Sequence, residues 1–259
     1  MRRIAGFVYG LTCYGVFFVT FLYLIAFLAN FMVPKGIDDG ANASTLAAAL
    51  IDIGLIALFG LQHSVMARPA FKRRLARLLP ESLERSTYVL ASSAALIVLY
   101  WQWRPLRESV WSIDSPTWGA ALWGLLLAGF GIVFLTSFVI DHFDLFGLRQ
   151  VWLALARRAY RHPAFRVTHF YRFVRHPLYF GLLLGIWCTP RMTLGHLLFA
   201  IGMTAYILVG IRFEERDMET FLGEDYRRYK ARVPMLIPNI VKPHEIVKPA
   251  AQDAGSRAH

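Results

Sequence analysis

Residues 178–211 read LYFGLLLGIWCTPRMTLGHLLFAIGMTAYILVGI, an apolar run of 34 residues that is interrupted near its middle by Pro190 and Arg191. As one α-helix with a rise of 1.5 Å per residue, the run would be about 51 Å long, which exceeds the ~30 Å hydrocarbon core of a bilayer. Proline breaks the helical hydrogen-bond ladder, and arginine is costly at mid-depth. The run therefore predicts a helical hairpin, with a short arm over 178–188 and a membrane-crossing arm over 192–211.

Four further apolar stretches precede this hairpin, and each is long enough to cross a bilayer as a helix. They cover residues 5–33, 45–66, 86–103 and 118–140. Hydrophobic residues make up 56% of the 259 residues and charged residues 17%, and the mean hydropathy is +0.44. This composition excludes a disordered, coiled-coil or collagen-like chain and argues against a water-soluble enzyme. We expect an all-α polytopic membrane protein with four transmembrane helices plus a C-terminal transmembrane helical hairpin.

The basic residues orient the chain in the membrane. Of 28 Lys and Arg residues, 24 fall in alternate loops: two before the first span, six in 67–85, seven in 141–176 and nine from residue 212 onward. The loops on the other side carry four. By the positive-inside rule both termini should be cytoplasmic. The same bias accounts for the net charge of +11, so we expect a lipid bilayer and no nucleic acid as partner. The sequence leaves the oligomeric state open.

Two polar motifs flank the hairpin on the predicted cytoplasmic side. The first is RHPLYFG at 175–181, in which a proline after a polar pair is a good start for a helix entering the membrane. Its arginine and tyrosine would also suit a simple interfacial anchor. The second motif begins with the adjacent carboxylates Glu214 and Glu215 and continues as LGEDYRRYKARVPMLIP at 222–238. On an ordinary cytoplasmic helix such carboxylates would only be solvated.

The order RHPxYxG, apolar hairpin, EE and LGxxYxxYxxRVPxxIP resembles the isoprenylcysteine carboxyl methyltransferase family and its bacterial relatives, which are integral membrane enzymes that use S-adenosylmethionine. The resemblance runs from residue 175 to 238, about a quarter of the chain, and its spacing is consistent. It implies a cytoplasmic cofactor-binding tail and an S-adenosylmethionine pocket built from both motifs. The residues that it implies at or near the cofactor are His176, Pro177, Tyr179, Gly181, Glu214, Glu215, Tyr226 and Tyr229.

Three upstream motifs resemble one bacterial subgroup of this family, whose members methylate methanethiol to dimethyl sulfide. They are LQHSVMARP at 61–69, ERSTY at 84–88 and DHFDLFGLRQ at 141–150. This resemblance implies an enzyme of the bacterial inner membrane that methylates a small thiol. A lipid or prenylcysteine acceptor on the same architecture, and a non-enzymatic membrane protein of the same shape, stay as alternatives.

A thiol acceptor would need activation, because the thiolate is the nucleophile and a free cysteine thiol has a pKa of about 8.5. A base or a cation should therefore lie near the sulfur. The candidates are His142, His63 and Asp144, with Arg149 as a charge stabiliser. Each histidine could instead make a structural hydrogen bond. No two of the eight histidines lie within four residues of each other, so we expect no paired-histidine metal site.

The chain divides into three regions on this interpretation. They are a four-span membrane region over 1–140, a catalytic region with the hairpin and the S-adenosylmethionine-binding segments over 141–241, and a tail over 242–259. The tail is rich in Pro, Ala and polar residues, and we expect it to be disordered.

Overall fold

The fold is described here from a computed structural model, for residues 1–160 and 169–239. The predicted tail over 242–259 lies outside the described residues. The elements are α1 (Arg2–Ala29), α2 (Thr45–Ala67), α3 (Pro69–Leu75), α4 (Glu81–Gln102), β1 (Ser109–Ser112), α5 (Pro116–Ile140), α6 (His142–Leu145), α7 (Leu148–Leu155), a 3₁₀ turn (His169–Arg172), α8 (Pro177–Trp187), β2 (Arg191–Thr193), α9 (Leu194–Leu222) and α10 (Glu224–Arg232). Over the described residues the predicted all-helical class is confirmed, apart from one short pair of strands.

Within the described residues, four helices are long and apolar enough to cross a membrane: α1, α2, α5 and α9. The predicted span 86–103 lies in α4, which has 22 residues but is not one of the four. Its first turns carry Glu81, Glu84 and Arg85, and these charges lower its mean hydropathy. The bilayer crossing by α8 and α9 as a hairpin, and a cytoplasmic tail, stay predictions.

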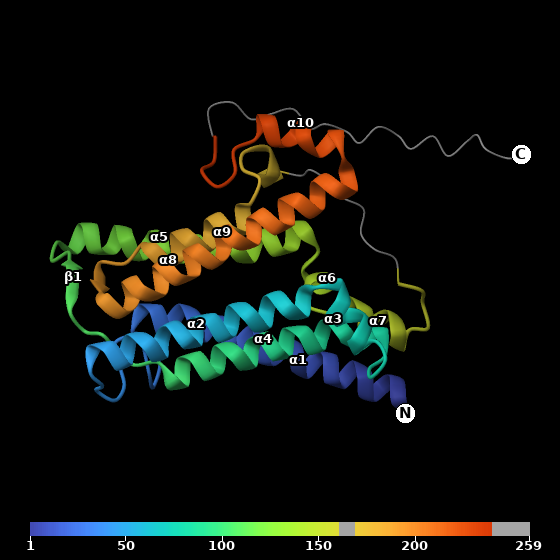
Figure 1. Cartoon of the computed structure of the whole chain (residues 1–259), viewed down its shortest axis with the longest axis horizontal. Helices are drawn as coiled ribbons and strands as arrows, with labels where there is room; N and C mark the ends of the chain where they lie inside the picture. The colour runs from blue at the N-terminus through green and yellow to red at the C-terminus, as the bar shows by residue number, and fades with distance from the viewer. Residues whose placement is uncertain (161–168, 240–259) are drawn as a thin grey trace, which may run out of the picture.

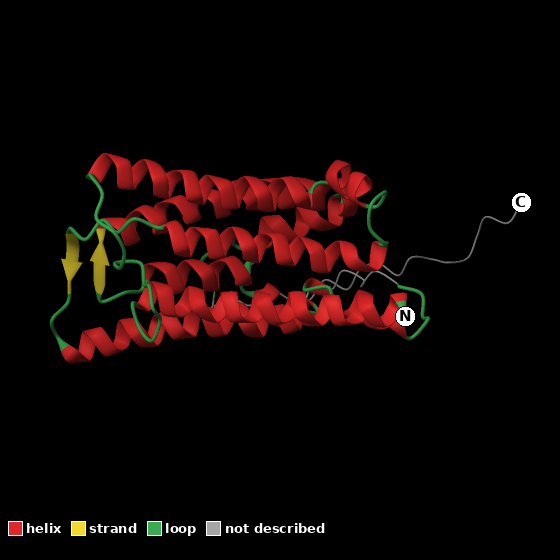
Figure 2. Cartoon of the chain, turned by 90° about the horizontal axis from the view of Figure 1, so that it is seen from below, coloured by secondary structure: helices red, strands yellow, loops and turns green. Residues whose placement is uncertain are grey.

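The long helices lie in two layers along one axis (Figures 1 and 2). One layer contains α5, α8 and α9, and the other contains α1, α2 and α4. A buried aromatic cluster joins the layers near the strands: the ring of Trp103 lies 6.1 Å from Phe27 of α1 and 5.8 Å from Phe199 of α9. All three side chains are at most 1% exposed. Burial of such large rings favours close association of the layers.

The segment between α8 and α9 contains the polar interruption seen in the sequence. β2 pairs antiparallel with β1, and Arg191 is exposed there. Thr193 begins α9 as its N-cap, and its hydroxyl accepts a hydrogen bond from the His196 amide at 3.3 Å. The His196 ring also lies 2.8 Å, through Nε2, from the carbonyl of Ile186 in α8. These contacts fix the direction in which α9 leaves the turn and runs beside α8 (Figure 1).

Glycines set the spacing between α5 and α8. A Cβ atom built on Gly129 of α5 would lie 2.5 Å from the Gly185 nitrogen and 2.6 Å from the Gly181 oxygen, both in α8. Small residues of this kind let helix backbones approach closely in a membrane. Gly181, which the resemblance places at or near the cofactor, has the backbone of α5 beside it, with the Gly129 oxygen 2.6 Å from a Cβ atom built there. Its absence of a side chain is therefore explained by helix packing.

We predict that Gly129→Ala destabilises the protein by roughly 1–3 kcal/mol, because the added methyl group meets backbone rather than a movable side chain. The matched control is Gly131→Ala in the same helix, where an added Cβ meets nothing within 4 Å. The measurement is the midpoint of detergent-induced unfolding in mixed micelles. Equal midpoints for the two variants would contradict the assigned contact.

Candidate active site

The two motifs that flank the hairpin lie against each other through their backbones. The amide of Arg175 donates to the Pro234 carbonyl at 2.9 Å, and the amide of His176 donates to the Met235 carbonyl at 3.2 Å. The amide of Asn239 donates back to the Phe173 carbonyl at 2.9 Å. Backbone hydrogen bonds thus align residues 173–176 with 234–239, although about 60 residues separate these segments in the chain.

The Glu215 carboxylate is the centre of an ion cluster between these segments. Its oxygens lie 2.9 Å from Arg175 Nε, 2.9 Å from Lys230 Nζ and 3.1 Å from His176 Nε2. Glu215 is 6% exposed, so its charge is held by these partners rather than by water. Lys230 also bonds the Glu219 carboxylate at 2.9 Å, and the two carboxylates, Glu219 first, raise the pKa of Lys230. The cluster is therefore charged, and Arg175 Nε lies at ion-pair distance from Glu215 without a well-directed hydrogen bond to it.

Glu214 has a different environment from its neighbour. Its carboxylate accepts a hydrogen bond from the Tyr179 hydroxyl at 3.0 Å, and its side chain is 49% exposed. The His176 ring, 5.6 Å from the Tyr179 ring, lies between the two carboxylates, with Nδ1 4.0 Å from Glu214. Of the adjacent pair, Glu215 is buried in the ion cluster, whereas Glu214 is about half-exposed.

Three other predicted cofactor residues have packing contacts in the structure. Tyr226 and Tyr229 of α10 are buried together with Val233, and the Tyr229 hydroxyl donates to the Tyr171 carbonyl at 2.9 Å. Burial raises the pKa of both phenols. Pro177 is the buried first residue of α8. These contacts are packing contacts, and a direct role for the three residues at a cofactor stays a prediction.

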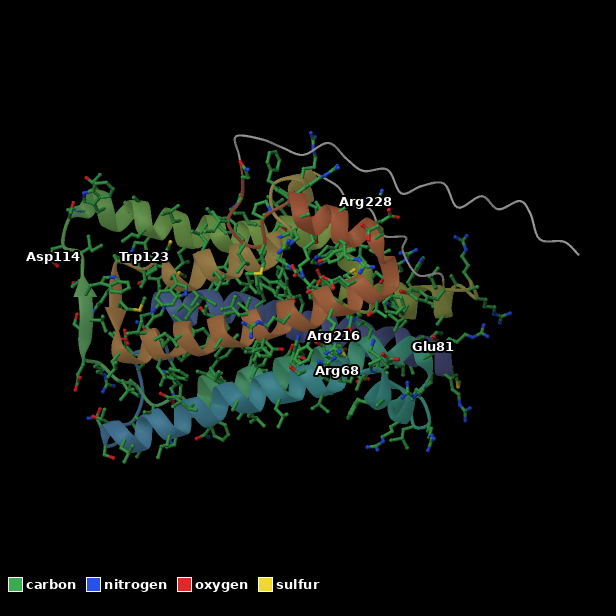
Figure 3. The ribbon with its side chains drawn as sticks, turned by 45° about the horizontal axis from the view of Figure 1, so that its top comes forward. Arg68, Glu81, Asp114, Trp123, Arg216 and Arg228 are labelled. Carbon is green, nitrogen blue, oxygen red and sulfur yellow. The ribbon has the colours of Figure 1, made fainter. Side chains whose placement is uncertain are left out.

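A surface groove adjoins the ion cluster. It has a volume of about 530 Å³ and is lined by Arg175, Lys230 and the segment from Ala231 to Asn239. Its volume lies within the ~300–1,000 Å³ usual for small-molecule sites. Figure 3 shows Arg228 of α10 toward the same end of the molecule as Arg68, Glu81 and Arg216, with Asp114 and Trp123 toward the other end. The charged site therefore belongs to one end of the bundle.

Three of the four residues predicted for thiol activation lie together around α6 and α7. Arg149 Nη1 is 2.6 Å from the Asp141 carboxylate and 3.8 Å from that of Asp144. Asp141 also caps α6 by accepting the Asp144 amide at 3.1 Å. The His142 ring is buried, and burial lowers its pKa while the Asp141 charge opposes the shift. A lowered pKa keeps this imidazole neutral near pH 7.

The fourth residue, His63, lies in a separate cluster. Its Nε2 is 2.7 Å from the Tyr88 hydroxyl and its Nδ1 is 3.0 Å from Ser92 Oγ. The sequence reasoning did not single out Tyr88 as a site residue, although it ends the ERSTY motif. The available signal was its place in that motif, because its partner His63 lies on another helix and no spacing within α4 points to the pairing.

The fold and the charged cluster define a polytopic helical membrane protein with a polar site at one end of its bundle. A family model described as NnrU protein matches residues 52–241. Proteins named methanethiol S-methyltransferase are similar over nearly the whole chain. One from Mycobacterium tuberculosis is 46% identical over 92% of this chain and 98% of its own, and one from Pseudomonas deceptionensis is 44% identical over 97% and 94%.

The chain therefore belongs to the NnrU protein family and is similar to the methanethiol S-methyltransferases, which confirms the resemblance of its motifs to the methanethiol-methylating subgroup. Nurim from Xenopus laevis is also similar, at 33% identity over 78% of this chain and 76% of its own. No solved structure matches. With four apolar helices and these relatives, the chain is an integral membrane protein.

We predict that Glu215→Gln destabilises the fold by roughly 3–5 kcal/mol, because the change leaves the cations around it without a buried counter-charge. The matched control is Glu219→Gln, which removes a 38% exposed partner of Lys230 and should cost at most about 1 kcal/mol. Unfolding of the two purified variants in detergent measures the difference. If Glu219→Gln were the more damaging change, the central role of Glu215 would be wrong.

Proposed function

We propose that this protein transfers a methyl group from S-adenosylmethionine to a small thiol, with methanethiol as the acceptor and dimethyl sulfide as the product. The observation that carries the proposal is the set of relatives named methanethiol S-methyltransferase, at 44–48% identity over nine-tenths or more of the chain. Their name states the acceptor and implies a methyl donor. The further identification of the donor as S-adenosylmethionine rests on the motif resemblance.

The residues around the ion cluster fit such a donor. The groove offers the cations Arg175, Lys230 and Arg232, which suit a carboxylate group. The half-exposed Glu214 carboxylate suits a ribose hydroxyl or an ammonium group, and the Tyr179 hydroxyl holds it in place. When bound, S-adenosylmethionine supplies a methyl group on a positively charged sulfur. Backbone alignment of 173–176 with 234–239 keeps these partners in fixed positions before any ligand arrives.

Methyl transfer from a sulfonium to a thiolate reduces charge separation, so a dry site favours it. The chain provides such surroundings where the charged end of α9 meets apolar helices. In this proposal His63, His142, Asp144 and Arg149 are the candidates for activating the thiol. Residues 141–241 carry the donor, and residues 1–140 form the membrane scaffold. Both termini face the cytoplasm of a bacterial inner membrane, where the donor is available.

The decisive test is a headspace assay with purified protein. We expect dimethyl sulfide to form from methanethiol and S-adenosylmethionine in proportion to the amount of protein. A thiol panel, with a prenylcysteine and phospholipid vesicles as competing acceptors, separates the small-thiol activity from a larger-acceptor activity. Methylation of only the larger acceptors would replace the proposed acceptor.

The similarity to Nurim keeps a non-enzymatic role as the alternative, because that name states no reaction. Calorimetry with S-adenosylhomocysteine separates the two roles independently of the acceptor. Absence of both binding and dimethyl sulfide would favour the non-enzymatic role.

We predict that Glu214→Gln weakens S-adenosylhomocysteine binding roughly ten- to hundredfold, the effect of losing a hydrogen bond to a charged group. The matched control is Glu224→Gln, at a 62% exposed carboxylate that pairs with Arg227 on α10, and its dissociation constant should stay near that of the wild type. Calorimetry measures both. Equal affinities for the two variants would remove Glu214 from the proposed binding site.

A further inference from the structure

His63 is part of a hydrogen-bonded relay whose proton positions follow from the contacts. Ser92 Oγ donates its proton to the Tyr88 carbonyl at 3.0 Å on its own helix. Ser92 can therefore only accept from His63, so the proton of the neutral ring is on Nδ1. Nε2 then accepts from the Tyr88 hydroxyl at 2.7 Å. The Tyr88 hydroxyl uses its proton in the hydrogen bond to His63, and its oxygen keeps lone pairs that can accept a hydrogen bond from a further donor.

The His142 ring is part of a relay of the same design. Ser137 Oγ donates to the Phe134 carbonyl at 2.6 Å and accepts from His142 Nδ1 at 2.7 Å. The Tyr14 hydroxyl donates to His142 Nε2 at 2.8 Å. The part of the chain that the structure describes thus contains two Tyr–His–Ser relays, and their surroundings decide which of them can reach a substrate.

The His142 relay is enclosed by aromatic rings. The His142 ring is stacked on Phe138 at 4.3 Å and has Phe146 at 4.9 Å, Phe143 at 5.4 Å and Phe134 at 5.7 Å. Only 3% of the residue is exposed. These contacts explain how α6 is held against α1 and α5, and they leave little room for a ligand at the ring.

The His63 relay is next to the donor site. The Tyr179 phenol, which bonds Glu214, lies close enough to the Tyr88 and Tyr206 phenols to be affected by a charge on either of them. The Tyr206 ring lies 6.2 Å from the His63 ring. Tyr88, His63, Tyr179 and Tyr206 are all half-buried, so part of each side chain remains available to a small molecule. This relay joins α2 and α4 to the α8 and α9 side of the bundle.

Arg85 adds a fixed positive charge to the same relay. Its guanidinium carbon lies 5.2 Å from the centroid of the Tyr88 ring, and its Nε donates to the Leu145 carbonyl at 2.7 Å. A cation held at this distance favours negative charge that develops on a nearby sulfur atom. The combination of a proton acceptor and a fixed cation is what thiol activation requires.

Given the proposed function, we propose that Tyr88 is the catalytic residue that receives the proton of the acceptor thiol, with His63 as the final proton acceptor and Ser92 as a positioning residue. The thiol proton passes to Tyr88 Oη as the Tyr88 proton passes to His63 Nε2. The sulfur forms its bond to the methyl carbon, and the bond from that carbon to the donor sulfur breaks and leaves its electron pair on the donor. The reaction leaves His63 as an imidazolium, which then loses its proton to solvent.

The test is the pH dependence of kcat/KM for methanethiol in Tyr88→Phe. At neutral pH we expect a loss on the order of 10²-fold, the usual lower limit for general acid–base catalysis. The loss should shrink as the pH rises from about 6.5 to about 9.5, because the fraction of free thiol present as thiolate grows with pH and needs no base. The groups facing the relay are Arg85 from α4, Tyr179 from α8 and Tyr206 from α9. Phenols ordinarily titrate at ~10, so these two phenols stay neutral over most of this range.

Two matched phenol deletions act as controls. Tyr14→Phe breaks the other relay, and any loss of kcat/KM that it causes should stay the same at every pH. Tyr9→Phe removes a hydroxyl that bonds Thr87, the neighbour of Tyr88, and should retain wild-type activity. Calorimetry with S-adenosylhomocysteine should give wild-type affinity for Tyr88→Phe. If that variant does not fold, Ser92→Ala takes its place with the same expectation of a pH-dependent loss.

Each outcome decides the assignment. A loss in Tyr88→Phe that is the same at every pH, or activity within threefold of wild type, overturns it. If instead the loss of kcat/KM in Tyr14→Phe shrinks as the pH rises, the proton-accepting role belongs to the His142 relay. Wild-type turnover is measured first, so absence of dimethyl sulfide from the wild-type protein counts against the proposed function and not against the choice of relay.

Discussion

The candidate site depends on one buried carboxylate, that of Glu215. A carboxylate is costly to bury unless charged and hydrogen-bonded partners surround it, and here Arg175, His176 and Lys230 supply those partners. These partners come from the segment before α8 and from α10, so neutralising the charge requires both segments to meet the end of α9. Successive helical residues are about 100° apart, since 3.6 residues make one turn. Glu214 is therefore directed away from the cluster when Glu215 is directed into it.

Hydropathy predicted the positions of the spans because it is a local property. The expected span 118–140 corresponds to α5 and 45–66 to α2, within one or two residues at each end. The ends of other helices were predicted less well. α4 begins at Glu81 rather than at 86, and α9 continues to Leu222, well past 211. In both cases charged residues ended the apolar run while the helix itself continued, since hydropathy reports where a helix meets water and not where its hydrogen bonds stop.

The motifs predicted correctly which segments of the chain lie together at the site. They predicted less well which side chains in those segments are left free to contact a ligand. The expected proximity of the RHP segment and the carboxylates is confirmed by the Tyr179–Glu214 and His176–Glu215 contacts. Gly181, however, packs on α5, whose contact residue Gly129 is distant in sequence. The pairing of His63 with Tyr88 likewise joins two helices, and spacing within either helix carries no information about it. Such choices are made by packing between helices, which local patterns do not encode.

The two histidine relays raise the question of why a neutral base would serve a sulfonium donor. A carboxylate placed beside the reacting atoms would pair with the sulfonium before the reaction, and stabilising the bound reactants raises the barrier that remains. A neutral imidazole avoids this because it gains charge only as the thiol loses its proton. In the structure both nearby carboxylates are bonded to groups outside the His63 relay. Glu215 is paired with Arg175 and Lys230, and Glu214 accepts a hydrogen bond from Tyr179. The exposed carboxylate of Glu214 is thus bonded to the Tyr179 phenol, whereas the His63 relay consists of neutral groups with one fixed cation, Arg85, beside it. In this proposal negative charge is used to bind the donor's polar groups, and neutral proton carriers serve the acceptor.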